Sequence, residues 1–347
     1  MENIIDFKNH ISKYNSNLRD FTVSRNNDKL YPWQVTGLTD AEGSFAYSLI
    51  KPKLDSNIHS TKIKFNLEFK ITQKNHSEGI LHELKDYFGC GSIIIDNRKT
   101  ETKKFQVKSL DSILNKVIPH FEKYPCLTSK QLNFMDWKKI AFIMYNKEHL
   151  TTNGMQEIIN LISRINKKRS FQDKFNFCNS TLALKSLSKD LSSVEYDLDP
   201  YWVQTFITSE GLFYNYVSET ESKNFNTVKI DSSLEIGQNS HEIAILIALQ
   251  KFFKGGYIKP KYNYTNLSDC IKSRLVNRFI YKYTDSIIKF VDQYPMLTRK
   301  HLDYLDWKKI VEMKNNNLHK TKNGLELIIQ IKNNMNSKRD VNYNSNI

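Results

Sequence analysis

The segment Val35-Thr36-Gly37-Leu38-Thr39-Asp40-Ala41-Glu42-Gly43 returns in altered form as Val203-Gln204-Thr205-Phe206-Ile207-Thr208-Ser209-Glu210-Gly211, 168 positions later. Each copy predicts a short helix that ends in a glutamate followed by a glycine, a residue suited to the left-handed conformation that closes many helices. An acidic side chain at a helix C-terminus is electrostatically unfavourable. Because repeated breaches of a local rule are expected mainly at functional sites, we expect a bound cation beside these glutamates.

Both predicted helices also carry small side chains on one face. Gly37 and Ala41 stand four residues apart in the first copy, as do Thr205 and Ser209 in the second. Small residues at this spacing let two helix backbones approach closely, which would bring the two glutamates together at one end. Two carboxylates share a site only when a metal ion or a proton intervenes, and their oxygen atoms suit Mg²⁺.

Further repeated segments follow each helix. Phe69-Lys-Ile-Thr-Gln73 returns as Leu234-Glu-Ile-Gly-Gln238, and Tyr124-Pro-Cys-Leu-Thr-Ser-Lys130 returns as Tyr294-Pro-Met-Leu-Thr-Arg-Lys300. The chain of 347 residues is therefore a tandem duplication, and two units fit its length. We expect an N-terminal basic extension (1–30), a first unit (31–169), a linker (170–199), a second unit (200–339) and a polar tail (340–347).

The hydrophobic period gives the order of elements within each unit. Apolar and polar residues alternate over 62–73 and again over 228–236, which predicts strands with one buried and one exposed face. A weaker alternation marks 45–50, 92–96 and 104–108, and helical patterns cover 76–88, 110–122, 128–146 and 152–168. The predicted fold is α+β, with a four-stranded antiparallel sheet in each unit, helices on one face of the sheet, and an open polar face on the other.

Composition suggests what meets the open faces. The formal net charge is +14 and the pI is about 9.3, which favours a polyanionic partner over a merely soluble basic surface. Lysines alone would hold phosphates, whereas interspersed polar side chains can address base edges in the major groove of DNA. Because the two faces differ in nearly every residue, any DNA target should be only imperfectly palindromic.

We expect the following residues to bind DNA from the open faces. In the first unit they are Ser44, Ala46, Ser48, Ile50, Lys64, Asn66, Glu68, Lys70, Thr72, Ile94, Asp96, Arg98, Lys104, Gln106 and Lys108. In the second unit they are Leu212, Tyr214, Tyr216, Ser218, Lys229, Asp231, Ser233, Glu235, Lys259, Lys261, Arg278, Ile280 and Lys282.

With these motifs the chain resembles the single-chain LAGLIDADG homing endonucleases encoded within fungal mitochondrial introns. The resemblance covers residues 31–339 and implies two pseudo-symmetric αββαββα units, packed through the motif helices into a DNA-binding saddle. It implies a monomer that hydrolyses both strands of a long, asymmetric DNA duplex and leaves short 3′ overhangs. It also implies Mg²⁺ or Mn²⁺ as cofactor, Ca²⁺ as a non-catalytic substitute, and a mitochondrial location.

The resemblance also implies roles for individual residues. Metal-binding acids fall on Glu42 and Glu210, with the carbonyls of Ala41 and Ser209 as further ligands. A metal ion bridging the acids would lower the pKa of a bound water and neutralise charge on the attacking and leaving oxygens. The other implied catalytic residues are the water-orienting glutamines Gln73 and Gln238 and the charge-stabilising lysines Lys130 and Lys300.

Some alternatives remain open. The second motif has Thr205 and Thr208 where the first has Gly37 and Asp40, which leaves room for an intron maturase that binds intron RNA and has lost cleavage. A DNA-binding regulator on the same scaffold is a third class. For Lys130, an exposed lysine that begins a helix is an alternative of equal weight. Neither a signal peptide nor a membrane span is expected.

Overall fold

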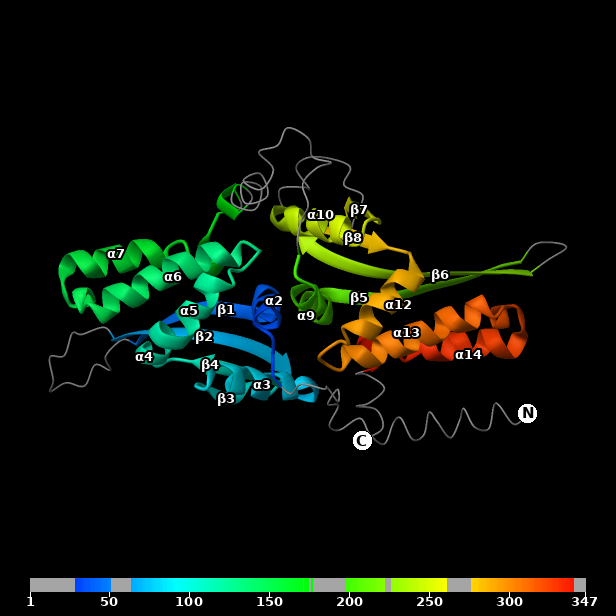
Figure 1. Cartoon of the computed structure of the whole chain (residues 1–347), viewed down its shortest axis with the longest axis horizontal. Helices are drawn as coiled ribbons and strands as arrows, with labels where there is room; N and C mark the ends of the chain where they lie inside the picture. The colour runs from blue at the N-terminus through cyan, green and yellow to red at the C-terminus, as the bar shows by residue number, and fades with distance from the viewer. Residues whose placement is uncertain are drawn as a thin grey trace.

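The computed structural model describes residues 29–50, 64–170, 172–174, 176, 198–221, 226–260 and 276–339. It contains two units, each built on a four-stranded antiparallel sheet, with strand orders β1-β2-β4-β3 and β5-β6-β8-β7. Figure 1 shows α2 and α9 side by side at the centre, with the sheets and the outer helices of the two units on opposite sides of this pair. The predicted α+β fold of two tandem units is confirmed.

The elements of the first unit follow the predicted order. They are α2 (Pro32–Glu42), β1 (Gly43–Ile50), β2 (Lys64–Lys74), η1 (Asn75–Ser77), α3 (Gly79–Phe88), β3 (Ser92–Asn97), β4 (Thr102–Val107), α4 (Leu110–Ser112), η2 (Ile113–Val117), α5 (Ile118–Lys123), α6 (Lys130–Tyr145), η3 (Glu148–Leu150), α7 (Thr152–Ile162) and η4 (Asn166–Lys168).

The second unit repeats this order. Its elements are α9 (Pro200–Glu210), β5 (Gly211–Glu221), β6 (Asn226–Asn239), η5 (Ser240–Glu242), α10 (Ile243–Phe252), β7 (Tyr257–Pro260), β8 (Val276–Tyr281), α12 (Thr284–Gln293), α13 (Lys300–Asn315), η6 (Leu318–Lys320) and α14 (Lys322–Asn333).

One predicted helix is too long. The helical pattern over 152–168 suggests a single helix, but α7 ends at Ile162. Asn166 adopts a positive φ of 58°, and its side-chain amide donates to the carbonyl of Phe45 at 2.9 Å. This contact turns the chain back onto β1, so the last residues of the pattern form the separate turn η4.

Each sheet buries its apolar face beneath helices of its own unit. In the first unit the strand residues Phe45, Phe69 and Phe105 are 0–1% exposed, as the alternation predicts, and Trp137 of α6 is 0% exposed. The indole N–H of Trp137 donates to the carbonyl of Ala46 at 2.9 Å, which ties α6 to β1. Such buried aromatic side chains are major contributors to core stability. Among the described residues, no helix is long and apolar enough to cross a membrane.

The central helix pair is closely packed around Gly37. An added Cβ on Gly37 would lie 2.1 Å from Thr205 Oγ1 and 2.7 Å from the carbonyl oxygen of Trp202. The predicted close approach of the two motif helices is therefore confirmed. The Thr205 side chain fills the space that is left because Gly37 has no side chain.

The glycines that follow the two helices do not adopt the predicted left-handed conformation. Gly43 has φ −78° and ψ 159°, and Gly211 has φ −73° and ψ 148°, so both are extended. A Cβ on Gly43 would lie 2.7 Å from Thr39 Cα, and one on Gly211 would lie 2.6 Å from the Ile207 carbonyl oxygen. Glycine is thus required because each chain turns directly from helix into strand against its own last turn.

Two loops of matching sequence cross between the units. Leu127 of the first unit packs against the hydrophobic core of the second, and Leu297 of the second is part of the core of the first. These leucines lie in the repeated Tyr-Pro-x-Leu-Thr-x-Lys segments. The lysine that ends each segment is therefore carried to the boundary between the units.

Candidate active site

Glu42 and Glu210 end the paired helices α2 and α9 at the same end of the pair. Glu42 opens to solvent and Glu210 is half-buried. The surrounding protein removes part of their hydration, which is the main cause of the raised pKa of both carboxyl groups. The negative charge of Glu42 further raises the pKa of Glu210, so the structure brings these two predicted residues together.

Two lysines supply positive charge at the helix ends. The ammonium group of Lys130 donates to the carbonyls of Thr39 and Ala41, both at 2.9 Å, and that of Lys300 donates to the carbonyl of Gly211. A cation at a helix C-terminus offsets the unfavourable placement of a glutamate there. The sequence pattern predicts a bound cation beside these glutamates, and the structure adds two cationic groups of the chain itself at the helix ends.

The lysines are inward-facing. Lys130 begins α6, as the alternative interpretation holds, but its side chain is half-buried against the end of α2. Burial lowers the pKa of both lysines, while the charges of Glu42 and Glu210 act in the opposite direction. Both lysines therefore interact electrostatically with both glutamates.

The two predicted glutamines lie near the ends of equivalent strands, β2 and β6. The side chain of Gln238 hydrogen-bonds to the carboxylate of Glu210 and lowers its pKa. Gln73 lines a pocket of about 300 Å³ together with Glu42 and Lys300. Ser209, Arg299 and Arg339 line the same pocket. Residues from both units therefore build one polar cavity at the centre of the molecule.

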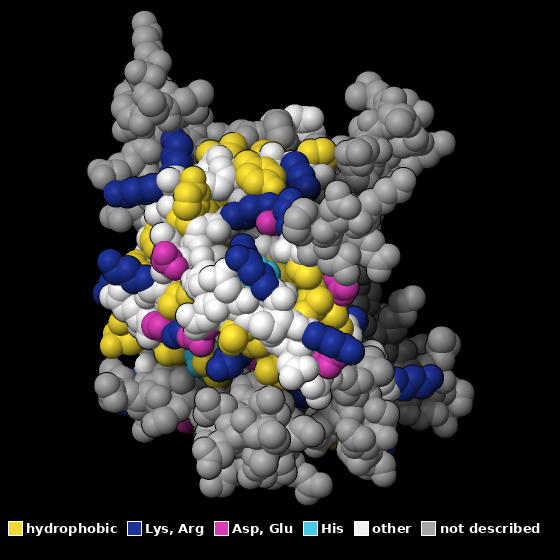
Figure 2. All heavy atoms as spheres, turned by 90° about the vertical axis from the view of Figure 1, so that its right-hand side faces the viewer, with side chains coloured by type: hydrophobic (Ala, Val, Ile, Leu, Met, Phe, Trp, Pro, Cys, Tyr) yellow, Lys and Arg dark blue, Asp and Glu magenta, His cyan; other side chains and the backbone are white. Residues whose placement is uncertain are grey.

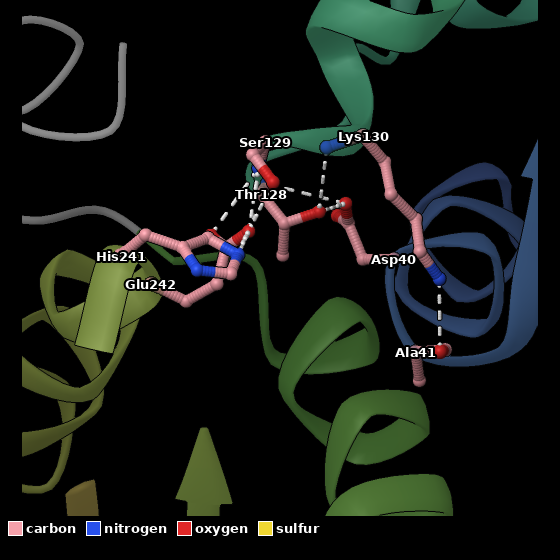
Figure 3. Close-up of polar contacts among 7 residues, drawn as sticks. All are labelled: Asp40, Ala41, Thr128, Ser129, Lys130, His241 and Glu242. Atoms are coloured by element: carbon pink, nitrogen blue, oxygen red, sulfur yellow. Dashed lines mark hydrogen bonds and ion pairs between the residues drawn. The ribbon is translucent and has the colours of Figure 1, made fainter. Parts of the chain in front are cut away.

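Figure 3 shows the loop that positions Lys130. Asp40 accepts hydrogen bonds from the backbone N–H groups of Leu127 and Thr128, at 2.9 and 3.2 Å, and from the Thr128 hydroxyl at 2.6 Å. Glu242, from the second unit, accepts from the backbone N–H and hydroxyl of Ser129. Sequence reasoning missed Glu242, because its pseudo-equivalent in the first unit is Ser77 and the repeat therefore carries no signal for it.

The donor set fits a divalent cation. No group of three or more His, Cys, Asp or Glu side chains within the described segments could hold a metal ion. Mg²⁺ does not need such a cage, because it is commonly held by one or two carboxylates together with waters and substrate phosphates. Glu42 and Glu210 supply two carboxylates, and the buried Ser209 hydroxyl between helix end and pocket has no hydrogen-bond partner among the described residues. These oxygen atoms are hard ligands of the kind that Mg²⁺ prefers.

The raised pKa values predict how pH affects stability without metal. Below about pH 4.5, the ordinary pKa of a glutamate, Glu42 and Glu210 are protonated in both the folded and the unfolded state, so they cost no stability there. As pH rises through that value towards the higher folded-state pKa, the unfolded chain loses its protons first and the folded state loses stability. The variant carrying Glu42→Gln and Glu210→Gln should therefore melt a few degrees above wild type at pH 7 in EDTA.

This difference should shrink as pH approaches 4, and saturating Mg²⁺ should raise the melting temperature of wild type only. Glu78→Gln is the matched control, since a hydrogen bond from Lys103 lowers the pKa of Glu78 and makes its charge stabilising. Glu78→Gln should therefore not raise the melting temperature at pH 7. Equal melting temperatures for wild type and the double variant at every pH would contradict the raised pKa values of Glu42 and Glu210.

The open face of each sheet carries ion pairs. Lys104 lies 3.1 Å from Glu68 and 3.5 Å from Asp96. In the second unit Arg278 contacts Glu235 at 2.6 Å. Pairing register places Lys104 next to Thr72 and Arg278 next to Gly237, so these two basic residues occupy equivalent places in the two sheets.

Exposure differs among the residues predicted to bind DNA. Tyr214 and Tyr216 are 38% and 45% exposed. Tyr257 is 44% exposed on the same face, and sequence reasoning missed it because β7 is too short to show an alternation. Four predicted contact residues are buried in this structure: Gln106, Ser233, Glu235 and Ile280. The role of every face residue stays a prediction.

Three predicted DNA contacts cannot be placed. Lys261 lies outside the described residues, as do the side chains of Ile50 and Lys64. The remaining predicted face residues lie on the described strands or directly beside them: Ser44, Ala46, Ser48, Asn66, Lys70, Ile94, Arg98, Lys108, Leu212, Ser218, Lys229, Asp231, Lys259 and Lys282. The predicted extension, linker and tail fall largely outside the described residues.

Basic residues are not gathered at the outer end of the second unit. Figure 2 shows the end that lies on the right in Figure 1, where the described Lys and Arg side chains are scattered among acidic, polar and hydrophobic ones. No single basic patch marks that end among the described residues.

Sequence comparison gives two kinds of match. Residues 35–141 and 205–311 match the profile of a protein family described as LAGLIDADG endonuclease. Two Neurospora crassa proteins, named "Probable intron-encoded endonuclease 3" and "Probable intron-encoded endonuclease 2", are each 30% identical to this chain over 93% and 88% of its length. The chain spans 56% and 65% of the length of these two relatives.

Solved structures of similar fold cover nearly the whole chain. The LAGLIDADG homing endonuclease I-SmaMI bound to cleaved DNA has a TM-score of 0.71 and 26% identity, over 90% of this chain and 98% of that chain. I-SmaMI bound to uncleaved DNA in the presence of calcium ions has a TM-score of 0.70 and 26% identity, over 88% and 99% of the two chains. I-LtrWI bound to its target DNA has a TM-score of 0.70 and 27% identity, over 88% and 98%.

Proposed function

Because the chain belongs to the LAGLIDADG endonuclease family, we propose that it is a site-specific homing endonuclease that hydrolyses both strands of a long, asymmetric DNA target. The observation that carries this proposal is the central set of Glu42 and Glu210, flanked by Lys130 and Lys300. A structural or purely DNA-binding scaffold has no need of two carboxylates held together at some electrostatic cost. Metal-dependent hydrolysis of a phosphodiester does require such carboxylates, because they hold the metal.

We assign each residue a part in hydrolysis. Glu42 and Glu210, with the carbonyls of Ala41 and Ser209, would hold divalent metal at the scissile phosphates. When bound, the metal supplies Lewis acidity and a bound water of lowered pKa. Gln73 and Gln238 would orient water, and Lys130 and Lys300 would stabilise the charge that develops on phosphate oxygens. The Lys130 ammonium already donates to the Ala41 carbonyl at 2.9 Å, so this oxygen would bind the metal through its second lone pair or after the lysine turns away.

The proposal extends to cofactor, product and cellular context. Mg²⁺ or Mn²⁺ would support cleavage and Ca²⁺ would support binding without cleavage, with short 3′ overhangs as the product. The two units supply both halves of the site, so a monomer suffices. The intron-encoded fungal relatives support expression in mitochondria.

Recognition of an asymmetric target is supported by the two sheet faces. Equivalent positions in register carry different chemistry, such as Lys70 against Glu235 and Ser48 against Tyr216. Exposed tyrosines enrich the second face, whereas Ser48 and Asn66 are exposed on the first. Because the faces differ, each half of the DNA target would be recognised through different contacts.

The ion pairs on the faces give a prediction for DNA affinity. Lys104→Met removes a phosphate-binding charge, takes the basic partner from Asp96 and leaves Glu68 only the more distant Lys108, at 3.9 Å. We expect the dissociation constant to rise by about tenfold or more, with a shallower salt dependence. Adding Glu68→Gln should restore part of the affinity, because it removes one of the repelling charges. Fluorescence anisotropy with labelled target measures both effects.

Lys147→Met is the matched control, since Lys147 lies in the exposed turn after α6, away from the sheet face. It should leave the dissociation constant unchanged. If Lys104→Met and Lys147→Met weaken binding equally, the first sheet does not present Lys104 to DNA.

Selection from a randomised duplex library tests the proposed function. Incubation of the purified chain with the library and Mg²⁺, followed by sequencing of cleaved ends, should yield one long asymmetric site with 3′ overhangs. The absence of any cleaved sequence would refute the nuclease proposal. Tight binding to an intron RNA together with that absence would favour the maturase alternative.

A further inference from the structure

Glu242 lies in the second unit but contacts the loop that carries Lys130 of the first. The backbone N–H of Ser129 donates to both carboxylate oxygens of Glu242, at 3.0 and 3.2 Å, and the Ser129 hydroxyl donates to the same carboxylate. Glu242 is 5% exposed and Ser129 is 5% exposed. Hydrogen bonds to a charged acceptor are stronger than those between neutral groups, and this one is also shielded from solvent.

We call this contact between Glu242 and Ser129 the clamp. It lies directly beside the proposed active site. Ser129 precedes Lys130, whose ammonium group reaches the carbonyl of Ala41 beside Glu42 (Figure 3). Glu242 ends η5, which directly follows the strand that carries Gln238. A single carboxylate thus ties the lysine of one unit to the glutamine-bearing strand of the other.

The second copy of the loop lacks this serine–glutamate pair. Ser129 corresponds to Arg299 in the repeated segment, and Glu242 corresponds to Ser77 at the end of η1. The Lys300 loop is held through Leu297, whose backbone N–H donates to the Thr208 hydroxyl at 3.3 Å, just as that of Leu127 donates to Asp40 at 2.9 Å in the first copy. The Lys130 loop has, in addition, the serine–glutamate contact that the second copy does not repeat.

We propose that Glu242 is a positioning residue for Lys130, and that it controls the cleavage of one DNA strand only. The inference rests on the proposed function. Lys130 bonds to the end of α2, and Lys300 bonds to the residue after α9, so each lysine serves a different scissile phosphate. A displacement of about 1 Å in a catalytic group can slow a reaction about a hundredfold, and loss of the clamp would displace Lys130 alone.

The test is strand-resolved cleavage of the selected duplex, labelled separately on each strand. With Glu242→Gln we expect one strand to be cut about ten to a hundred times more slowly and the other at the wild-type rate, so that nicked DNA accumulates. The slow strand should be the one that is slow with Lys130→Met. DNA affinity should match that of wild type, and the melting temperature should fall by no more than a few degrees, because a buried charge-assisted hydrogen bond is weakened.

Two further variants keep the test sharp. Ser129→Ala removes only the hydroxyl and should slow the same strand by a smaller factor, and adding it to Glu242→Gln should bring no further loss. Glu78→Gln is the matched control, because Glu78 directly follows Ser77, the counterpart of Glu242, and pairs with Lys103 and His82 at the surface. It should change neither strand.

The outcomes separate the two proposals. If wild type cuts both strands and Glu242→Gln cuts both equally well, the positioning role is wrong and the nuclease proposal stands. Equal slowing of both strands, or slowing of the strand that Lys130→Met spares, also overturns the positioning role. If wild type cuts neither strand of any duplex, both proposals fail.

Discussion

Replacing Glu42 or Glu210 with glutamine is expected to slow cleavage by about 10³-fold or more while DNA affinity stays within a few-fold of wild type. Glutamine keeps the shape of the side chain but lacks the charge that holds a divalent ion. If the lost interaction is worth about 4 kcal/mol in the transition state, the rate falls by about three powers of ten. Single-turnover cleavage in Mg²⁺ and anisotropy in Ca²⁺ measure the two quantities.

The affinity measurement separates loss of chemistry from loss of folding. Glutamine removes the repulsion between the two carboxylates, which already raises the pKa of Glu210, so the folded state should not suffer in the absence of metal. Glu78→Gln again serves as a charge-matched control and should cleave at the wild-type rate. Wild-type cleavage by either active-site variant would show that the paired carboxylates do not hold the catalytic metal.

The second large effect concerns the helix pair that carries these glutamates. Gly37→Ala is expected to destabilise the fold by about 3 kcal/mol, the upper part of the range for overpacking. The new methyl group would lie 2.1 Å from Thr205 Oγ1, and Thr205 is held by hydrogen bonds to the carbonyls of Tyr201 and Trp202, each at 3.1 Å. Because neither the Thr205 hydroxyl nor the Trp202 carbonyl can move freely, α2 and α9 must separate. Urea unfolding measures the loss.

Two variants define the cause of this loss. Adding Thr205→Ala removes the side-chain clash but leaves the Trp202 carbonyl oxygen 2.7 Å away, so only part of the stability should return. Gly79→Ala is the control, since an added methyl group there has no heavy atom within 4 Å, and this variant should be neutral or slightly stabilising. Equal stability of the Gly37 and Gly79 variants would contradict the packing described for α2 and α9.

Sequence pattern revealed the sheets because alternation is a local property. Phe65, Leu67, Phe69 and Ile71 alternate with polar residues, and all four are buried on the core side of β2. The central glutamates stood out because the motif helix occurs twice, whereas the glutamines and lysines were assigned through the family resemblance that the repeated segments carry. Repetition supplied the signal that a single motif would not have given.

Contacts made once, between distant segments, left no such signal. Glu242 and Ser129 are 113 positions apart and are not repeated as a pair. Ile280 shows the same limit, because its register places it on the open face, yet it is 2% exposed beside Tyr257 and Glu235. Burial on a sheet face depends on neighbouring strands, which alternation within one strand does not describe.

Thr205 and Thr208, which stand where the first motif has Gly37 and Asp40, are explained by their contacts. Thr205 fills the space left by Gly37, and Asp40 accepts a hydrogen bond from the indole of Trp202 at 2.8 Å across the helix pair. Thr208, at the position equivalent to Asp40, accepts from the backbone N–H of Leu297 at 3.3 Å, as Asp40 accepts from that of Leu127 at 2.9 Å. The motif helices are thus complementary without being identical, and neither departure removes a carboxylate from the centre.

The most direct measurement is a metal-initiated cleavage time course on the selected duplex. The chain is first bound to DNA in EDTA, and Mg²⁺ is then added while both strands are followed separately. We predict no cleavage before Mg²⁺, cleavage of both strands after it, and no cleavage by the variant that carries both Glu42→Gln and Glu210→Gln. Cleavage in EDTA, or undiminished cleavage by that double variant, would contradict the paired-carboxylate metal site at the centre of this account.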